Sequence, residues 1–365
     1  MSVSATEFSR APHCLQAPRQ PRFAPAGAPA YAPPPWLPGG NLQTIWAALR
    51  ARRFEGRMPP PLQRERWSTP DGDFIDVDWL QEAPLAADSA IPDARRTLVV
   101  LFHGLEGSSA SHYAQAFAAE ARARGLRYAI PHFRGCSGEI NRAPRAYHSG
   151  DFEEMDWILR RMRARHAGPL VAVGVSLGGN ALMRWAGEMG AAAAHTVDAV
   201  ASVCAPLDLA AGGNAICRGF NRQVYNRMFL RTMQAKAQAL AAQHPGLIDV
   251  SRLRAARDLH AFDDMFTAPL HGFRDVGDYW QRASARPHLA RIRIPALALN
   301  ARNDPFIPAE SLPRPAEAGP CVTLWQPAEG GHVGFPRGAW PSDVGWLPAA
   351  VCTWLLAHAG QAHSP

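Results

Sequence analysis

The sequence predicts an α/β fold in which a mostly parallel central sheet carries helices on both faces and a mainly helical cap is inserted. Two observations lead to this prediction. From residue 97 onward, continuous apolar runs alternate with stretches of helical periodicity, as expected for strands buried on both faces. Between about 207 and 288 this alternation stops, and a long helical stretch rich in arginine, methionine and aromatic residues replaces it.

Each expected strand is a short apolar run, and each expected helix has apolar residues at helical spacing. We expect strands over 97–104, 126–138, 169–176, 197–206, 294–304 and 321–332. We expect helices over 41–50, 112–125, 151–166, 178–190 and 345–360. Upstream, residues 64–80 alternate in polarity around Pro70-Asp71-Gly72, which predicts a hairpin.

The domain organisation follows from composition. Residues 1–30 are rich in proline and alanine and are expected to form a disordered or loosely docked tail. Residues 31–365 are expected to form one domain, with the cap inserted at about 207–288. A chain of 365 residues, 47% of them hydrophobic, is long enough for one large core with a satellite subdomain.

The charge and the cysteine content of the chain indicate which partners and which cellular compartment to expect. The net charge is +7, and Lys236 is the only lysine. The arginines look scattered along the sequence, so we expect no nucleic-acid partner. Six cysteines without a C-x-x-C pair indicate mostly reduced thiols and a cytoplasmic protein. We see no secretory signal and no run of about 18 apolar residues, so no membrane-spanning helix is expected.

Ser176 is the candidate nucleophile. It lies in Gly174-Val175-Ser176-Leu177-Gly178, which fits the pattern G-x-S-x-G. In this pattern the serine occupies a sharp turn between a strand and a helix, and its neighbours must be small. An apolar run precedes the motif and a helical pattern follows it, so the sequence provides the context that the motif requires.

A serine hydroxyl needs a base to accept its proton and an acid to orient that base. Asp304 follows one late strand, and His332 follows the last one, in the chain order expected for this fold. Asp208, after an earlier strand, is a competing acid. Asp263 and Asp264 are weaker candidates that we interpret as cap structure.

The developing oxyanion of acyl transfer needs hydrogen-bond donors. The backbone N–H of Leu177, directly after the nucleophile, and that of Leu105, after the first apolar strand, are the candidates. We interpret His103 as a residue that organises this loop. There are 14 histidines but no pattern at metal-ligand spacing and no nucleotide-binding loop, so neither a metal nor a cofactor is expected.

Several segments together resemble a known family. They are "PPPWLPGGNLQTIW" (33–46), "TPDGDFIDVDW" (69–79), "HGLEGSS" (103–109), "FRGCSGEINRAPRAYHSG" (133–150), "GVSLGGNAL" (174–182), "FDDMFTAPLHGF" (262–273), "NARNDPFIP" (300–308) and "GGHVGF" (330–335). The chain resembles the α/β-hydrolases and, within them, the YheT-like or embryogenesis-associated hydrolases. Asn41 departs from the family pattern, which has histidine there.

The resemblance implies a triad of Ser176, Asp304 and His332, with oxyanion donors at Leu105 and Leu177. It implies hydrolysis of carboxylic esters with short acyl chains, or of monoacylglycerols, with transient contact to lipid substrates. Two alternatives stay open. One is an acyltransferase with the same triad, and the other is a non-catalytic binding scaffold. The resemblance assigns no role to the "RGCSG" and "YHSG" segments, and the oligomeric state is not predicted.

Overall fold

An eight-stranded sheet forms the centre of the molecule within residues 29–54, 59–81 and 95–360, which the computed structural model describes. The strands are β1 (Leu62–Ser68), β2 (Phe74–Leu80), β3 (Leu98–Phe102), β4 (Arg127–Pro131), β5 (Leu170–Val175), β6 (Ala199–Val203), β7 (Ala296–Leu299) and β8 (Val322–Trp325). They are ordered β1-β2-β4-β3-β5-β6-β7-β8. The expected tail over 1–30 lies almost wholly outside the described residues.

The sheet is parallel from β4 to β8, and the hairpin of β1 and β2 adds two antiparallel strands at one edge. The expected hairpin and the six expected strands are therefore confirmed, although each strand is shorter than its apolar run. A buried parallel strand needs apolar side chains on both faces. All five residues of β3 and all six of β5 are buried accordingly.

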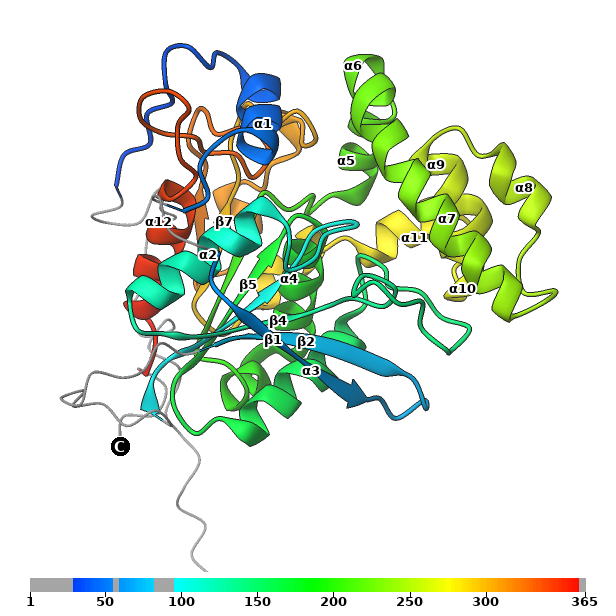
Figure 1. Cartoon of the computed structure of the whole chain (residues 1–365), viewed down its shortest axis with the longest axis horizontal. Helices are drawn as coiled ribbons and strands as arrows, with labels where there is room; N and C mark the ends of the chain where they lie inside the picture. Colours follow the sequence, from blue (N-terminus) through cyan, green and yellow to red (C-terminus); the bar gives the residue numbers. More distant parts are fainter. Residues whose placement is uncertain (1–28, 55–58, 82–94, 361–365) are drawn as a thin grey trace, which may run out of the picture.

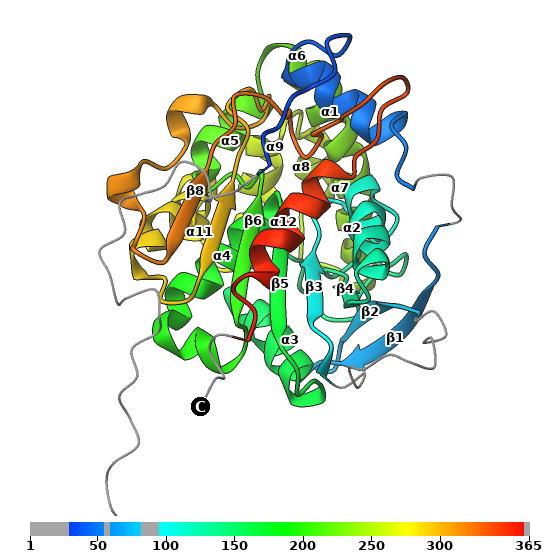
Figure 2. The ribbon, with the colours of Figure 1, turned by 90° about the vertical axis from the view of Figure 1, so that its left-hand side faces the viewer.

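Helices cover both faces, as predicted. One face packs against α2 (His112–Ala123) and α12 (Trp346–Leu356), and the other against α3 (Phe152–Arg165) and α4 (Leu177–Met189). Strand β3 shows the alternation, because Val99 belongs to the apolar cluster that includes the first pair of helices and Val100 to the cluster that includes the second. Figure 2 shows α12 and α2 lying across the near face of the sheet.

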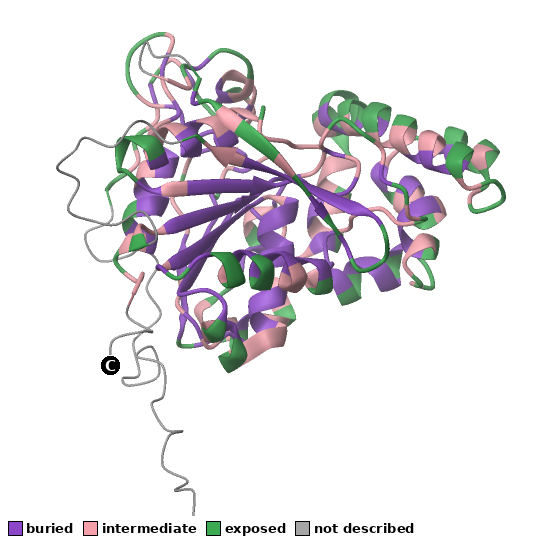
Figure 3. Cartoon of the chain, turned by 60° about the horizontal axis from the view of Figure 1, so that its bottom comes forward, coloured by how far each residue is buried: buried purple, intermediate pink, exposed green. Residues whose placement is uncertain are grey.

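Between β6 and β7 the chain forms a group of helices that we call the outer helices. They are α5 (Leu209–Ile216), α6 (Gly219–Asn221), a π-helical turn (Arg222–Asn226), α7 (Arg227–Gln243), α8 (Val250–Ala255), α9 (Leu259–Phe262), a second π-helical turn (Asp263–Thr267), α10 (Ala268–Leu270) and α11 (Val276–Ala283). They lie to one side of the sheet in Figure 1 and have an apolar cluster of their own. Their outward sides are largely exposed (Figure 3).

The remaining helix, α1 (Gly40–Leu49), lies at the same end of the molecule as the carboxyl ends of the parallel strands (Figure 1). A Cβ on Gly40 would lie 3.0 Å from the carbonyl carbon of Asn303 in the loop after β7. Only glycine permits this close approach. Helix α1 is thereby held against a loop that is more than 250 residues away in sequence.

Candidate active site

Ser176 occupies the turn between β5 and α4. Its backbone has φ 53° and ψ −118°, a left-handed conformation that is strained for a residue with a side chain. Its N–H donates to the carbonyl oxygen of Val203 at 2.8 Å, which holds the turn in place. A Cβ on Gly178 would lie 2.6 Å from the carbonyl oxygen of Phe102, so this flanking position admits only glycine.

The structure brings Ser176, His332 and Asp304 into one chain of hydrogen bonds. The Ser176 Oγ lies 3.0 Å from His332 Nε2, and His332 Nδ1 lies 2.8 Å from Asp304 Oδ2. The second carboxylate oxygen of Asp304 accepts from the backbone N–H of Phe306 at 2.8 Å. The Phe306 ring also packs against the imidazole, with 4.1 Å between ring centroids. The imidazole is therefore fixed on one edge by the carboxylate and on one face by an aromatic ring.

Helix α1 supports the loops that carry the acid and the histidine, a role that the sequence did not reveal. The Thr44 Oγ1 accepts from the backbone N–H of His332 at 2.8 Å and donates to the carbonyl of Gly40 at 2.7 Å. The buried Gln43 Oε1 accepts from Asn303 Nδ2 at 3.0 Å and from the N–H of Gly330 at 2.9 Å. Both residues belong to the "GGNLQTIW" segment, so this segment positions the candidate triad.

The other acidic candidates lie in different surroundings. Asp208 caps α5 by accepting from the N–H of Ala211 at 3.0 Å. Asp264 accepts from the N–H of Val276 at 3.1 Å. Asp263 accepts from Thr267 Oγ1 at 2.7 Å, and burial raises the pKa of its carboxyl to about 6. Each of the three carboxylates serves the outer helices, and Asp304 is the one that contacts His332.

The backbone N–H groups of Leu105 and Leu177 belong to residues that line the same pocket as Ser176. The loop of Leu105 comes close to the serine, because a Cβ on Gly104 would lie 3.1 Å from the Ser176 Cβ. The N–H of Gly104 donates to the hydroxyl of Tyr113 at 2.8 Å. Leu177 is the first residue of α4, where backbone N–H groups lack partners within the helix and favour negative charge.

His103 and Cys136 are buried beside residues that line the pocket. The His103 Nδ1 lies 2.8 Å from the carbonyl of Gly104, and its Nε2 accepts from the N–H of Phe133 at 3.0 Å. Burial lowers the pKa of His103 to about 3, so the ring is neutral and organises the loop. Burial raises the pKa of the Cys136 thiol to about 11, which disfavours the nucleophilic thiolate.

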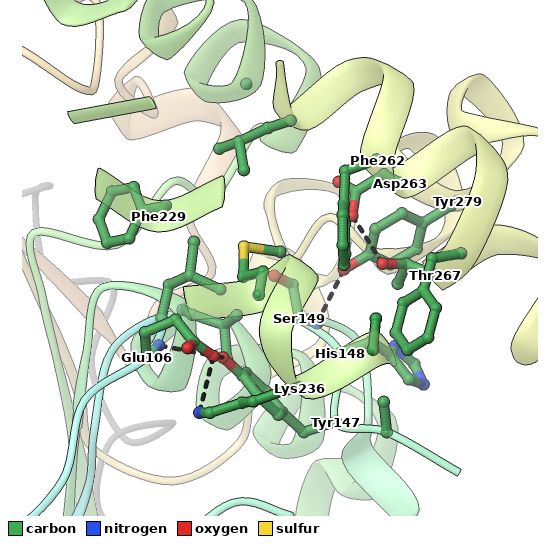
Figure 4. Close-up of a pocket in the computed structure, with 18 of the residues that line it drawn as sticks. Glu106, Tyr147, His148, Ser149, Phe229, Lys236, Phe262, Asp263, Thr267 and Tyr279 are labelled. Atoms are coloured by element: carbon green, nitrogen blue, oxygen red, sulfur yellow. Dashed lines mark hydrogen bonds and ion pairs between the residues drawn. The ribbon is translucent and has the colours of Figure 1, made fainter. Parts of the chain in front are cut away.

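A cavity of about 1210 Å³, part of it open to solvent, connects Ser176 with the outer helices. Figure 4 shows aromatic side chains, among them Phe229 and Phe262, on its outer-helix side. Leu240 and Phe266 add to this apolar wall. Burial of apolar surface is the main source of affinity for an alkyl chain, so the cavity suits an apolar group attached to the reacting carbonyl.

The only lysine of the chain joins the outer helices to the loop of Leu105. Lys236, on α7, places its Nζ 2.9 Å from Glu106 Oε1 and 3.3 Å from Cys136 Sγ. The same carboxylate oxygen accepts from the hydroxyl of Tyr147 at 2.8 Å, as Figure 4 shows. A buried carboxylate is stable only when it is paired and hydrogen-bonded. This ion pair therefore ties α7 to the residue next to Leu105.

The structure gives the two unassigned family segments structural roles. Tyr147 of "YHSG" also accepts from the backbone N–H of Glu106 at 3.0 Å, which fixes the loop after β3. Arg134 of "RGCSG" is buried and forms ion pairs with Asp73 at 2.8 Å and Glu154 at 2.6 Å. It thereby joins the turn of the hairpin to α3.

Three further properties of the described part of the chain concern metal binding, membrane insertion and free thiols. No group of three or more metal-ligating side chains occurs there. None of its helices combines the length and the apolar character that crossing a membrane requires. Four of its cysteines are free thiols, namely Cys136, Cys204, Cys217 and Cys352, whereas Cys321 is disulfide-bonded.

Comparison with known proteins agrees with the fold and with ester chemistry. The family model described as the alpha/beta hydrolase fold matches residues 97–339. A candidate esterase of Escherichia coli, YheT, is 39% identical over 87% of this chain and 90% of that protein. The mouse phospholipase ABHD3 is 28% identical over 93% of this chain and 81% of that protein. The human monoacylglycerol lipase ABHD2 is 27% identical over 89% of this chain and 80% of that protein.

Among solved structures, an esterase from Pyrococcus furiosus superposes with a TM-score of 0.50. The match covers 85% of this chain and 99% of that one, at 13% sequence identity. At this identity the likeness concerns the fold alone.

Proposed function

The chain belongs to the α/β-hydrolase family, in its YheT-like group, and is a hydrolase that acts on esters; from this premise we propose that it is a serine esterase with Ser176, His332 and Asp304 as its triad. The observation that carries the proposal is the hydrogen-bond chain from the serine hydroxyl through the imidazole to the carboxylate. This arrangement, on a strained strand–helix turn, is the one that makes a serine hydroxyl nucleophilic.

In the proposed reaction, Ser176 Oγ attacks the ester carbonyl while His332 Nε2 takes the hydroxyl proton. The N–H groups of Leu105 and Leu177 donate to the oxyanion as it forms. His332 then gives the proton to the leaving alcohol, and the acyl group stays on Ser176. Water, deprotonated by His332, attacks this acyl-enzyme and releases the carboxylic acid. Asp304 keeps the imidazole oriented and stabilises its charged form.

The proposed substrates are esters with a short acyl chain, monoacylglycerols among them. The apolar wall of the cavity, with Phe229 and Phe262, supports an alkyl chain on the acyl side. The relatives named as a phospholipase and a monoacylglycerol lipase support lipid esters. We further propose that the outer helices form the cap that shapes this pocket, and that the chain is cytoplasmic, in keeping with its four free thiols.

Hydrolysis of a series of p-nitrophenyl esters from acetate upward tests the proposal. We expect Ser176→Ala to lose at least about a thousandfold in kcat/KM. Ser251→Ala, which removes an exposed hydroxyl on α8, should retain full activity. Equal rates for wild type and Ser176→Ala would refute the serine mechanism. Acyl products that appear only with an added alcohol would indicate an acyltransferase, and binding without turnover would indicate a scaffold.

A further inference from the structure

The outer helices from α5 to α7 carry positive charge only. Residues 209–248 contain four arginines and Lys236 but no aspartate or glutamate. In the whole chain, by contrast, 38 basic residues are offset by 31 acidic ones. A run of 40 residues without a carboxylate therefore gives this part of the outer helices a local excess of positive charge. The segment is distinguished by the absence of carboxylates, since arginine is no more frequent here than in the rest of the chain.

The arginines share their surface with exposed apolar side chains. Phe220 is 53% exposed, Val224 37% and Met228 54%, and they follow one another at intervals of four residues along the continuous helix of α6, the π-helical turn and α7. Exposed apolar side chains this large are uncommon on one helix face unless a partner covers them. We call this surface the basic–apolar face, and it comprises Phe220, Arg222, Val224, Arg227, Met228 and Arg231.

The charges of this face are available to a partner. Within the described residues, Arg227 and Arg231 form no ion pair, and the closest carboxylate to Arg222 is that of Asp258 at 4.0 Å. An exposed pair at this distance contributes little. The guanidinium groups therefore remain free to bind anions.

The same helix lines the cavity with its opposite face. Phe229 and Met233 belong to the cavity wall, whereas Arg227 and Met228 are exposed. Figure 1 shows α6 and the start of α7 at the top of the view, the end of the molecule where α1 also lies. A partner bound to the basic–apolar face would therefore lie one helix away from the substrate cavity.

We propose that the basic–apolar face docks the protein on a lipid bilayer that bears anionic phospholipids. Arginines attract the negatively charged headgroups, and Phe220 and Met228 enter the interface between headgroups and acyl chains. This combination of free cations and interspersed apolar side chains fits a membrane surface. A purely electrostatic polyanion site would not need the apolar side chains. The docking does not depend on the proposed triad, since it concerns binding alone.

Co-sedimentation with vesicles tests the proposal. The full chain carrying Ser176→Ala is used, so that lipid hydrolysis cannot alter the vesicles. One set of vesicles contains phosphatidylcholine alone, and the other an equal mixture of phosphatidylcholine and phosphatidylglycerol. We expect binding to the anionic vesicles only, weakening as salt is added. Each arginine near an anionic surface strengthens binding about fivefold, so Arg227→Gln/Arg231→Gln should weaken it about 25-fold.

Two further variants separate the apolar contribution from charge alone. Phe220→Ser/Met228→Ser keeps every charge and should still weaken vesicle binding at least about tenfold. Arg122→Gln/Arg160→Gln removes two exposed arginines from α2 and α3 and should leave binding unchanged. In an otherwise wild-type chain, all three double variants should hydrolyse p-nitrophenyl acetate at the normal rate, which shows that they fold.

Several outcomes would overturn the proposal. Equal binding to neutral and anionic vesicles, or no binding to either, would contradict the electrostatic attraction. Vesicle binding that neither Arg227→Gln/Arg231→Gln nor Phe220→Ser/Met228→Ser weakens would place the contact elsewhere on the molecule. Binding to poly-uridylic acid that needs the arginines but not Phe220 and Met228, without vesicle binding, would assign the face to a polyanion instead. A failure of ester hydrolysis would refute the proposed triad and leave the vesicle result standing.

Discussion

Thr44 offers a sharp test of how helix α1 acts on the candidate site. Its Oγ1 accepts from the backbone N–H of His332 at 2.8 Å, and Thr44 is not one of the residues that line the cavity. Thr44→Val keeps the shape of the side chain and removes the acceptor. The N–H of His332 is then buried without a partner, which costs about 1–3 kcal/mol.

The loop that carries His332 can avoid this cost only by moving, and movement misplaces the imidazole relative to Ser176. If about 1.4 kcal/mol of the cost is expressed in the transition state, kcat falls about tenfold. Thr44→Ser retains the oxygen and is the matched control, with kcat near that of wild type. Since Thr44 positions the histidine and does not contact substrate, we expect KM to change little.

Steady-state kinetics on p-nitrophenyl acetate, with a pH profile of kcat/KM, measures this effect. Urea unfolding of the same proteins reports the stability cost separately. A Thr44→Val protein whose kcat stays within about twofold of that of Thr44→Ser would refute the reasoning, because the buried N–H would then have no influence on the histidine.

Three further predictions follow from the same structure. Asp304→Asn should lower kcat by about 10⁴, whereas Asp208→Asn should change kcat less than about threefold; a larger loss for Asp208→Asn, in parallel assays, would contradict the assignment of the acid. Lys236→Met leaves its carboxylate partner unpaired beside the loop of Leu105, so we expect a loss of about 1–2 kcal/mol in unfolding free energy and a lower kcat. Lys236→Arg keeps the positive charge and should recover much of the lost stability, measured by urea unfolding, and much of the lost kcat. A Lys236→Arg protein that recovers neither would argue against the ion pair. Burial lowers the pKa of His103 and of His148 to about 3, so both are neutral in the native chain while the unfolded chain binds protons below about pH 6.5. The stability that comes from keeping these two histidines neutral is fully present above about pH 6.5. As the pH drops below that value, the free energy of unfolding falls by up to about 1.4 kcal/mol per pH unit for each histidine. Urea midpoints that are equal at about pH 7 and about pH 5 would contradict this prediction.

Local patterns predicted the sheet and the candidate triad. The apolar runs that became β3 and β5 are buried on both faces, so their composition alone distinguishes them from half-exposed strands. Ser176 was predictable because its turn needs glycine at a fixed flanking position. Asp304 and His332 followed from chain order, since the carboxyl ends of parallel strands meet at one edge of the sheet.

Contacts between distant segments were not predictable. Thr44 and His332 are 288 residues apart, and nothing in the local pattern around Thr44 marks it as a hydrogen-bond acceptor for that loop. Lys236 stood out as the only lysine, but its partner Glu106 lies 130 residues away on another element. Such pairs are determined by tertiary packing. The periodicity of a single sequence indicates local secondary structure and does not indicate which distant segments meet.

The basic–apolar face of the outer helices was not predicted from the sequence. Arg222, Arg227 and Arg231 are spread along the chain among apolar residues. A π-helical turn between α6 and α7 changes the number of residues per turn, and these arginines and the apolar side chains between them are all exposed along one continuous helix. A surface of this kind is recognised only once the helix geometry is known.

Covalent labelling tests the central claim most directly. The wild-type chain is treated with a fluorophosphonate probe, digested, and analysed by peptide mass spectrometry. We predict that one phosphonyl adduct forms on Ser176, that it abolishes ester hydrolysis in proportion to its yield, and that Ser176→Ala forms none. An adduct on another residue that accompanies loss of activity, or full activity with Ser176 completely modified, would contradict the account.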